Sequence, residues 1–122
     1  MVARILGDNP TMRIVRFEQK CPAHTSKIAI VVDKDEDYHF YRQDSNGMWS
    51  HKPGGTAVTD KDADGRPIYD PKLANRNYDA KGSKLNYDIF CSYFCVPRDR
   101  PLYLKIGGRQ RRFRTRRQRQ IR

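Results

Sequence analysis

The sequence predicts an α+β fold, a small single domain dominated by antiparallel strands with a central hairpin and an extended basic C-terminal tail. Three observations lead to this class. Short segments rich in β-branched and aromatic residues recur between turn-forming residues. One of the turns contains Asn46-Gly47, a pair that favours tight hairpins. Eight arginines and no acidic residue lie between Arg109 and Arg122, so this stretch is not expected to build a core.

The N-terminal part of the chain predicts an arm and two strands. Residues Met1–Pro10 are expected to form an N-terminal arm. Apolar and polar residues alternate over Thr11–Glu18, which suits an edge strand. Lys27–Asp33 is a continuous β-branched run followed by an acidic turn, and such a run is typical of a central strand buried on both faces.

A β-hairpin is predicted next, with Tyr38–Gln43 and Met48–His51 as its arms and Asp44–Gly47 as its turn. Side chains of a strand alternate between the two faces of its sheet. The first arm therefore divides into two sets: Tyr38, Phe40 and Arg42 on one face, and His39, Tyr41 and Gln43 on the other.

The second half of the domain is punctuated by turn-forming residues. Glycine, proline, asparagine and aspartate are dense from Pro53 to Ser83, which predicts an ordered surface excursion with one short helix at Pro71–Arg76. The aromatic segment Leu85–Val96 fits a short helix or a strand, and its periodicity leaves both open. Leu102–Ile106 is the expected last strand, and Gly107-Gly108 is an expected hinge. The compact domain is thus placed at residues 11–106 and the arginine-rich tail at residues 107–122.

The charge of the chain is concentrated in the tail. The 122 residues carry a formal net charge of +11, but without the eight tail arginines only 17 basic and 14 acidic side chains remain. No apolar run approaches the ~20 residues of a membrane-spanning helix. The polar start does not resemble a signal peptide, so a soluble, intracellular protein with reduced thiols and no cofactor is expected.

The tail arginines are the first candidate site. Guanidinium groups bind phosphates and carboxylates in a planar, bidentate manner. The expected partner is anionic: a nucleic acid, an acidic protein or an anionic membrane surface. The predicted anion- or partner-binding residues are Arg109, Arg111, Arg112, Arg114, Arg116, Arg117, Arg119 and Arg122.

Three cysteines and a histidine form a second candidate site. Cys21, His24, Cys91 and Cys95 match the ligand types of a Cys₃His zinc site, although Cys91 and Cys95 equally suit two small buried thiols. A disulfide from Cys21 to either of the other two cysteines is the remaining alternative in an oxidising space.

His39, His51 and Cys91 form a third constellation. A thiol nucleophile needs a base, and the base needs a group that orients it. The order and spacing of these residues resemble the circularly permuted papain-like fold of NlpC/P60 and lecithin:retinol acyltransferase-like enzymes. That resemblance implies His39 as base, His51 as orienting group and Cys91 as nucleophile of a thiol hydrolase or acyltransferase. The alternative is that both histidines are structural residues of an aromatic hairpin.

A longer resemblance covers roughly Cys21–Pro97 and includes the run Trp49-Ser-His-Lys-Pro-Gly. Together with Asp70–Tyr78 and Asn86–Pro97, this run resembles small proteins of nucleocytoplasmic large DNA viruses, chlorovirus-like ones especially. The resemblance implies a non-enzymatic virion structural protein, a minor capsid component found in the virion and in the host cytoplasm during assembly. Capsid proteins would be its partners, and the arginine-rich tail would bind neighbouring capsid proteins, membrane or packaged nucleic acid.

Overall fold

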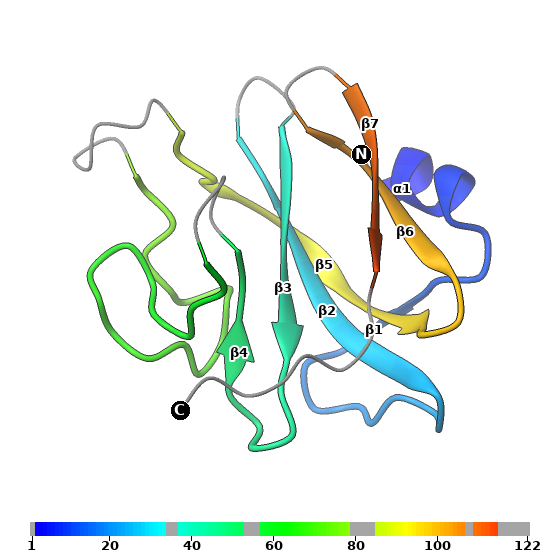
Figure 1. Cartoon of the computed structure of the whole chain (residues 1–122), viewed down its shortest axis with the longest axis horizontal. Coiled ribbons are helices and arrows are strands. Elements are labelled where there is room, and N and C mark those ends of the chain that lie inside the picture. Colours follow the sequence, from blue (N-terminus) through cyan, green and yellow to red (C-terminus); the bar gives the residue numbers. More distant parts are fainter. Residues whose placement is uncertain (1, 34–36, 53–56, 79–84, 107–108, 115–122) are drawn as a thin grey trace.

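The computed structural model describes residues 2–33, 37–52, 57–78, 85–106 and 109–114 (Figure 1). These residues form two antiparallel sheets and one seven-residue helix, so the predicted α+β class is wrong and the protein is mainly β. The elements in chain order are α1 (Val2–Asp8), β1 (Arg13–Val15), β2 (Thr25–Val32), β3 (Tyr38–Gln43), β4 (Trp49–Ser50), β5 (Ile89–Pro97), β6 (Pro101–Ile106) and β7 (Arg109–Arg114).

The main sheet has five strands in the order β1-β5-β2-β3-β4, and all its neighbours are antiparallel. The predicted central strand is confirmed as β2. Seven of its eight residues, from Ser26 to Val32, are buried. A continuous apolar run suits this position because both faces of the strand are covered.

The predicted hairpin is also confirmed, as β3 and β4. The backbone N–H of Asp44 donates to the Met48 carbonyl, and that of Gly47 donates to the Asp44 carbonyl. Gly47 has a φ of 84°, a conformation that favours glycine. The predicted faces hold, since Tyr38 and Phe40 contact one core while Tyr41 contacts the other.

The segment that suited either a helix or a strand is β5, and it contains a bulge. Phe90 pairs with Val31 and Ser92 pairs with Ile30, so Cys91 is an extra residue in the ladder. The bulge reverses the alternation of side chains. Phe90 therefore packs on the same face as Tyr93, while Cys91 packs on the opposite face.

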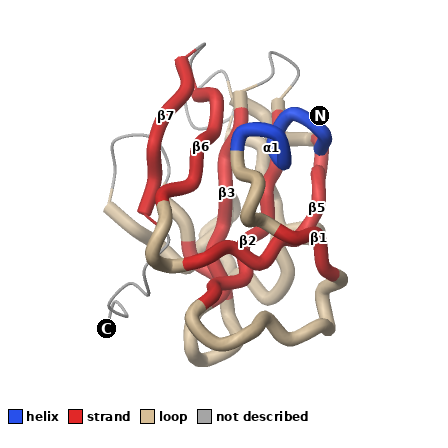
Figure 2. Tube along the Cα trace, turned by 90° about the vertical axis from the view of Figure 1, so that its right-hand side faces the viewer, coloured by secondary structure: helices blue, strands red, loops and turns tan. Residues whose placement is uncertain are grey.

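Each face of the main sheet has its own apolar core. The first core lies under α1 and the β6–β7 hairpin, and the second lies under the excursion that follows β4. Figure 2 shows β6 and β7 on one side of β3, apart from the main sheet. The buried first core comprises Ile5, Met12, Ile28, Ile30, Val32, Tyr38, Phe94, Val96, Leu102 and Leu104. The buried second core comprises Ala29, Val31, Tyr41, Trp49, Ile68, Tyr87 and Tyr93.

Three segments differ from the expectation. The expected N-terminal arm contains α1, whose Ile5 is buried in the first core. No helix forms at residues 71–76; instead the N–H groups of Leu73 and Ala74 both donate to the Asp70 carbonyl in a single turn. The tail expected to be extended is partly folded: residues 109–114 form β7, which pairs along its whole length with β6. The expected hinge at residues 107–108 lies outside the described residues.

Within the described ranges, no helix is long and apolar enough to span a membrane.

Candidate anion-binding groove

A groove of about 610 Å³ lies between β7 and the start of β3. Its described lining has five cationic side chains and a single acidic one, Asp37. The cations are Arg42, Lys52, Arg109, Arg111 and Arg114. Aromatic rings of β3 and β7 and the buried histidines His39 and His51 form much of the rest. A concave surface with this excess of positive charge attracts anions, and its walls reduce the screening by solvent.

Strand β7 holds three of these arginines in place. Phe113, half-buried between exposed arginines, packs against Phe40 with their ring centroids 5.2 Å apart. Arg109 and Arg111 share the face of Phe113 because side chains alternate along the strand. Within the described part of the chain, none of the β7 arginines forms an ion pair with an acidic side chain. The sheet therefore fixes the backbone of these arginines, and among the described residues their guanidinium groups have no acidic partner.

The structure places the eight predicted anion-binding residues in three groups. Arg109, Arg111 and Arg114 line the groove. Arg112 is exposed on β7 but does not line the groove. The other four, Arg116, Arg117, Arg119 and Arg122, lie outside the described residues.

His39 and His51 form a buried hydrogen-bonded pair in the wall of the groove. His39 Nε2 lies 2.8 Å from His51 Nδ1, and His51 Nε2 lies 2.8 Å from the carbonyl oxygen of Lys61. A carbonyl only accepts, so His51 donates from Nε2 and its neutral ring accepts at Nδ1. His39 must then donate from Nε2. One backbone carbonyl thereby fixes the tautomers of both rings.

Burial keeps both rings neutral. Desolvation, with a smaller contribution from the neighbouring His51, lowers the pKa of His39 to about 3. Desolvation also lowers the pKa of His51, although the Lys61 carbonyl opposes the shift. The Tyr87 ring stacks on His39 with centroids 5.0 Å apart, and the Tyr41 ring lies 4.6 Å from His51. The two histidines are therefore neutral residues packed against the aromatic rings of the second core.

Cys91 is not brought to these histidines. Its half-buried thiol packs against the first core, on the opposite face of the sheet from the rings around His39. Desolvation raises the pKa of this thiol, which disfavours the reactive thiolate. The β5 bulge is the reason, since regular alternation would have placed Cys91 on the face of Tyr93. The arrangement required by the papain-like resemblance is therefore not formed by these three residues.

Cys21 and Cys95 form a disulfide, with their sulfur atoms 2.04 Å apart. Of the alternatives that the sequence left open, the structure thus has Cys21 paired with Cys95 rather than with Cys91. Disulfide sulfurs are not thiolate ligands, so Cys21 and Cys95 cannot serve the Cys₃His zinc site. No cluster of three or more metal-ligating side chains is found in the described ranges. His24 is exposed in a turn beside this disulfide.

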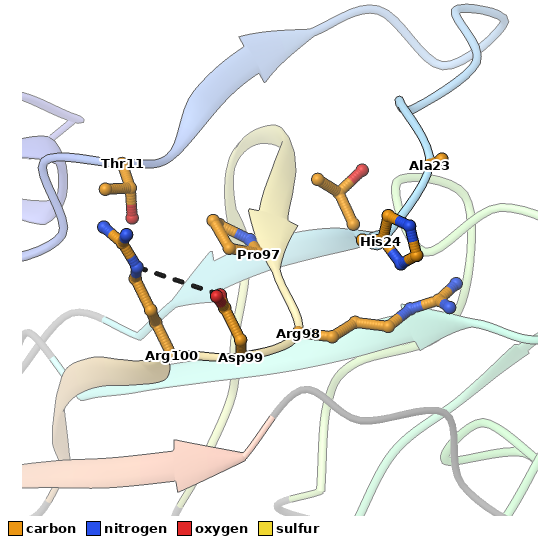
Figure 3. Close-up of a pocket in the computed structure, with 8 residues that line it drawn as sticks. Thr11, Ala23, His24, Pro97, Arg98, Asp99 and Arg100 are labelled. Carbon is orange, nitrogen blue, oxygen red and sulfur yellow. Dashed lines mark ion pairs between the residues drawn. The ribbon is translucent and has the colours of Figure 1, made fainter.

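A second hollow, of about 660 Å³, lies beside His24 (Figure 3). Its two arginines are already engaged. Arg100 Nε lies 3.8 Å from an oxygen of Asp99, and Arg98 Nε donates to the Ser26 hydroxyl over 3.0 Å. Figure 3 shows Asp99 between these arginines. The internal carboxylate makes this hollow a weaker site for an anion than the groove beside β7.

The loop at Asp60-Lys-Asp-Ala-Asp-Gly65 has carboxylates at alternate positions, a spacing similar to that of calcium-binding loops. Its central carboxylate has a structural role instead. Asp62 Oδ1 accepts the N–H groups of Asp64 and Arg66, and Oδ2 accepts that of Asn75. This carboxylate therefore closes the loop and ties it to the turn after Pro71.

Comparison with known proteins gives one partial likeness. A protein of the clam Ruditapes philippinarum, named insoluble matrix shell protein 1, is 57% identical over 49 residues. These residues are 40% of this chain and 33% of the clam protein, so the likeness spans about a third of that relative. No family model and no solved structure matches. The prediction of a minor capsid protein in a virion or in host cytoplasm is wrong, because the likeness found is to a shell matrix protein.

Proposed function

We propose that this chain is a structural matrix protein that binds an anionic macromolecule through the groove beside β7. The observation that carries the proposal is that three arginines of one paired strand, Arg109, Arg111 and Arg114, line the same concave surface. The partial likeness to a protein named as an insoluble shell matrix component supports a structural role rather than a catalytic one.

The chemistry of the groove suits carboxylates, sulfates and phosphates alike. A guanidinium forms paired hydrogen bonds with each of these groups, and charge-assisted hydrogen bonds are about twice as strong as neutral ones. Several such contacts along an extended polyanion add together, while one small anion would gain little at an exposed strand. A macromolecular partner is therefore favoured over a small ligand.

The disulfide supports a location outside the reducing interior of the cell. Cys21 and Cys95 are separated by 74 residues and connect the turn before β2 to strand β5. Disulfides persist in secreted proteins and are rare in the cytosol. We therefore replace the expected intracellular location and reduced thiols with an extracellular one, in keeping with the matrix role.

Binding of labelled polyglutamate and of a sulfated polysaccharide, measured by fluorescence anisotropy at several salt concentrations, tests the proposal. The variant has Arg109, Arg111 and Arg114 each replaced by glutamine. We expect weaker binding and a salt dependence reduced by roughly 2 to 3 ions, because each arginine contact releases about one counterion.

The matched control removes the same charge elsewhere, with glutamine in place of Arg13, Lys20 and Arg66, which are exposed and away from the groove. This control should retain most of the affinity. Equal losses in the two variants would show that only net charge matters and would overturn the groove as the binding site. Salt-independent binding by the unaltered chain would overturn the anionic partner itself.

A further inference from the structure

Strand β7 has an unpaired outer edge within the described part of the chain. Among the residues that the structure describes, the β6–β7 sheet contains two strands, and β7 pairs only with β6. Unpaired strand edges present backbone donors and acceptors to which another extended chain can bind. A contact on the opposite edge of β6 shows which backbone groups of β7 point outward.

The side chain of Asn9 occupies the opposite edge of this sheet. Asn9 Oδ1 accepts the N–H of Tyr103 over 2.7 Å, and Asn9 Nδ2 donates to the Tyr103 carbonyl over 2.8 Å. Both backbone groups of Tyr103 therefore point away from β7. In an antiparallel pair, opposite residues either exchange both hydrogen bonds or point both sets of groups outward.

Arg112 is the residue opposite Tyr103, so its N–H and carbonyl also point outward, from the free edge of β7. Gln110 and Arg114 follow the same alternation. Arg111 and Phe113, by contrast, are hydrogen-bonded to β6. The free edge thus offers the backbone groups of three residues, in the spacing that an added strand requires.

Side chains on both faces of this edge carry positive charge. Arg109 and Arg111 share the face of Phe113, while Arg112 and Arg114 hold the alternate positions of the strand, and Arg114, at the end of β7, also lines the groove. Side chains of directly opposed residues on neighbouring strands have Cβ atoms about 5 Å apart, so opposite charges attract and like charges repel there. An added strand with acidic residues on both faces would be complementary to the arginines of β7.

We infer that β7 binds an extended acidic polypeptide as the third strand of the β6–β7 sheet. The acidic character of this partner rests on the proposed function, whereas its polypeptide nature rests on the backbone geometry. A nucleic acid or sulfated glycan has no regular row of amide donors and acceptors to complete the ladder. The edge therefore selects a peptide chain from among the polyanions that the arginines attract.

Amide hydrogen exchange measured by NMR tests this inference on the unaltered protein. The probe is a short peptide of the repeat Glu-Thr-Asp, and a thymidine oligonucleotide of equal charge is the comparison. The peptide should slow exchange at Gln110 and Arg112, whose N–H groups point away from β6, and change exchange at Arg111 and Phe113 little. Equal slowing by both probes, or none at these two amides, would overturn strand addition.

A proline variant tests the same edge by affinity. Gln110→Pro removes one outward N–H without removing a charge or a hydrogen bond to β6, and edge strands tolerate proline. We expect roughly a tenfold loss of peptide affinity, since one lost ladder bond and the disrupted neighbours are worth about that factor. Oligonucleotide binding should be unchanged, and the matched Gln110→Ala control should bind both probes normally.

The outcomes separate the two proposals. Unchanged peptide binding in Gln110→Pro overturns strand addition, while salt-dependent binding of both probes would still support the anionic partner. A third outcome is that the glutamine variant of the groove loses binding and Gln110→Pro binds neither probe. This outcome would indicate a folding defect in the proline variant. In that case the exchange pattern of the unaltered protein decides the inference.

Discussion

The buried histidine pair predicts a protein that loses stability in mild acid. His39 is neutral when folded, with its pKa lowered to about 3 by burial, but has an ordinary pKa near 6.5 when unfolded. A lowered folded-state pKa means that the stability is fully present above about pH 6.5 and is lost as the pH falls. The loss continues until the folded form is itself protonated, near pH 3.

The size of the effect follows from linkage. Each pH unit between the two pKa values costs about 1.4 kcal/mol per histidine. Lowering the pH from about 7.5 to about 5 crosses roughly 1.5 units below the unfolded pKa, so His39 alone removes about 2 kcal/mol from the free energy of unfolding. His51 adds to the loss in the same direction, because its pKa is also lowered.

The assay is urea unfolding at these two pH values for the unaltered chain and for His39→Gln. Glutamine keeps a donor near the position of Nε2 for the His51 ring but does not titrate. The variant is expected to be less stable at neutral pH, yet to lose about 2 kcal/mol less on acidification. His24→Asn is the control, since His24 is exposed and asparagine tolerates its positive φ of 66°.

The reasoning is refuted if His39→Gln loses as much stability on acidification as the unaltered chain. Nitrogen NMR of the imidazole rings gives an independent check that does not depend on the variant folding. His39 should remain neutral and protonated at Nε2 at about pH 5, well above its lowered pKa. A charged His39 ring in the folded protein at that pH would contradict the burial argument.

Two further predictions concern the links between elements. Reduction of the Cys21–Cys95 disulfide should lower the free energy of unfolding by about 4 kcal/mol, because the bond closes a long loop and restricts the unfolded chain. Urea unfolding with and without reductant measures the effect, and the variant with serine at both positions should match the reduced protein. An unchanged free energy of unfolding would contradict the bond. Asn9→Asp should lower the free energy of unfolding by about 3 kcal/mol, because a carboxylate cannot donate a hydrogen bond to the Tyr103 carbonyl. A thermal unfolding midpoint equal to that of the unaltered chain would contradict this contact.

The elements that the sequence predicted correctly are those specified by neighbouring residues. The continuous β-branched run of β2 and the Asn46-Gly47 turn between β3 and β4 both act over a few residues. The same locality explains why His39 and His51 could be expected on the two arms of one hairpin. Their 2.8 Å contact is nevertheless fixed by Lys61, a residue of the later excursion.

Features that depend on distant partners could not be obtained in this way. The bulge at Cys91 arises from the pairing of β5 with β2, and it moves the thiol to the opposite face from His39. The pairing of Cys21 with Cys95 rather than Cys91 follows from the same register, since Cys95 is adjacent to Lys27 and Arg13 in the sheet. The extra residue in β5 thus decided the position of the thiol, while the regular register of the same strand decided the position of the disulfide.

The composition of residues 109–114 hides strand β7, whereas their distance from the preceding strand indicates it. Eight arginines predict a solvated tail when they are considered alone. Yet only two glycines separate Ile106 from Arg109 in the sequence. Two strand-forming segments joined by a Gly-Gly pair are typical of a hairpin. Phe113, the single aromatic residue among the arginines, is the side chain that packs on Phe40.

The folding of residues 109–114 changes how a partner would be bound. A disordered arginine tail must lose backbone and side-chain freedom when it binds, and that loss opposes association. In β7 the backbone is already ordered by β6 and by Phe113, so only the side chains and the partner remain to be ordered. Part of the charge first attributed to a tail is therefore presented by a preformed edge, and preformed geometry lets a binding surface discriminate between polyanions of equal charge.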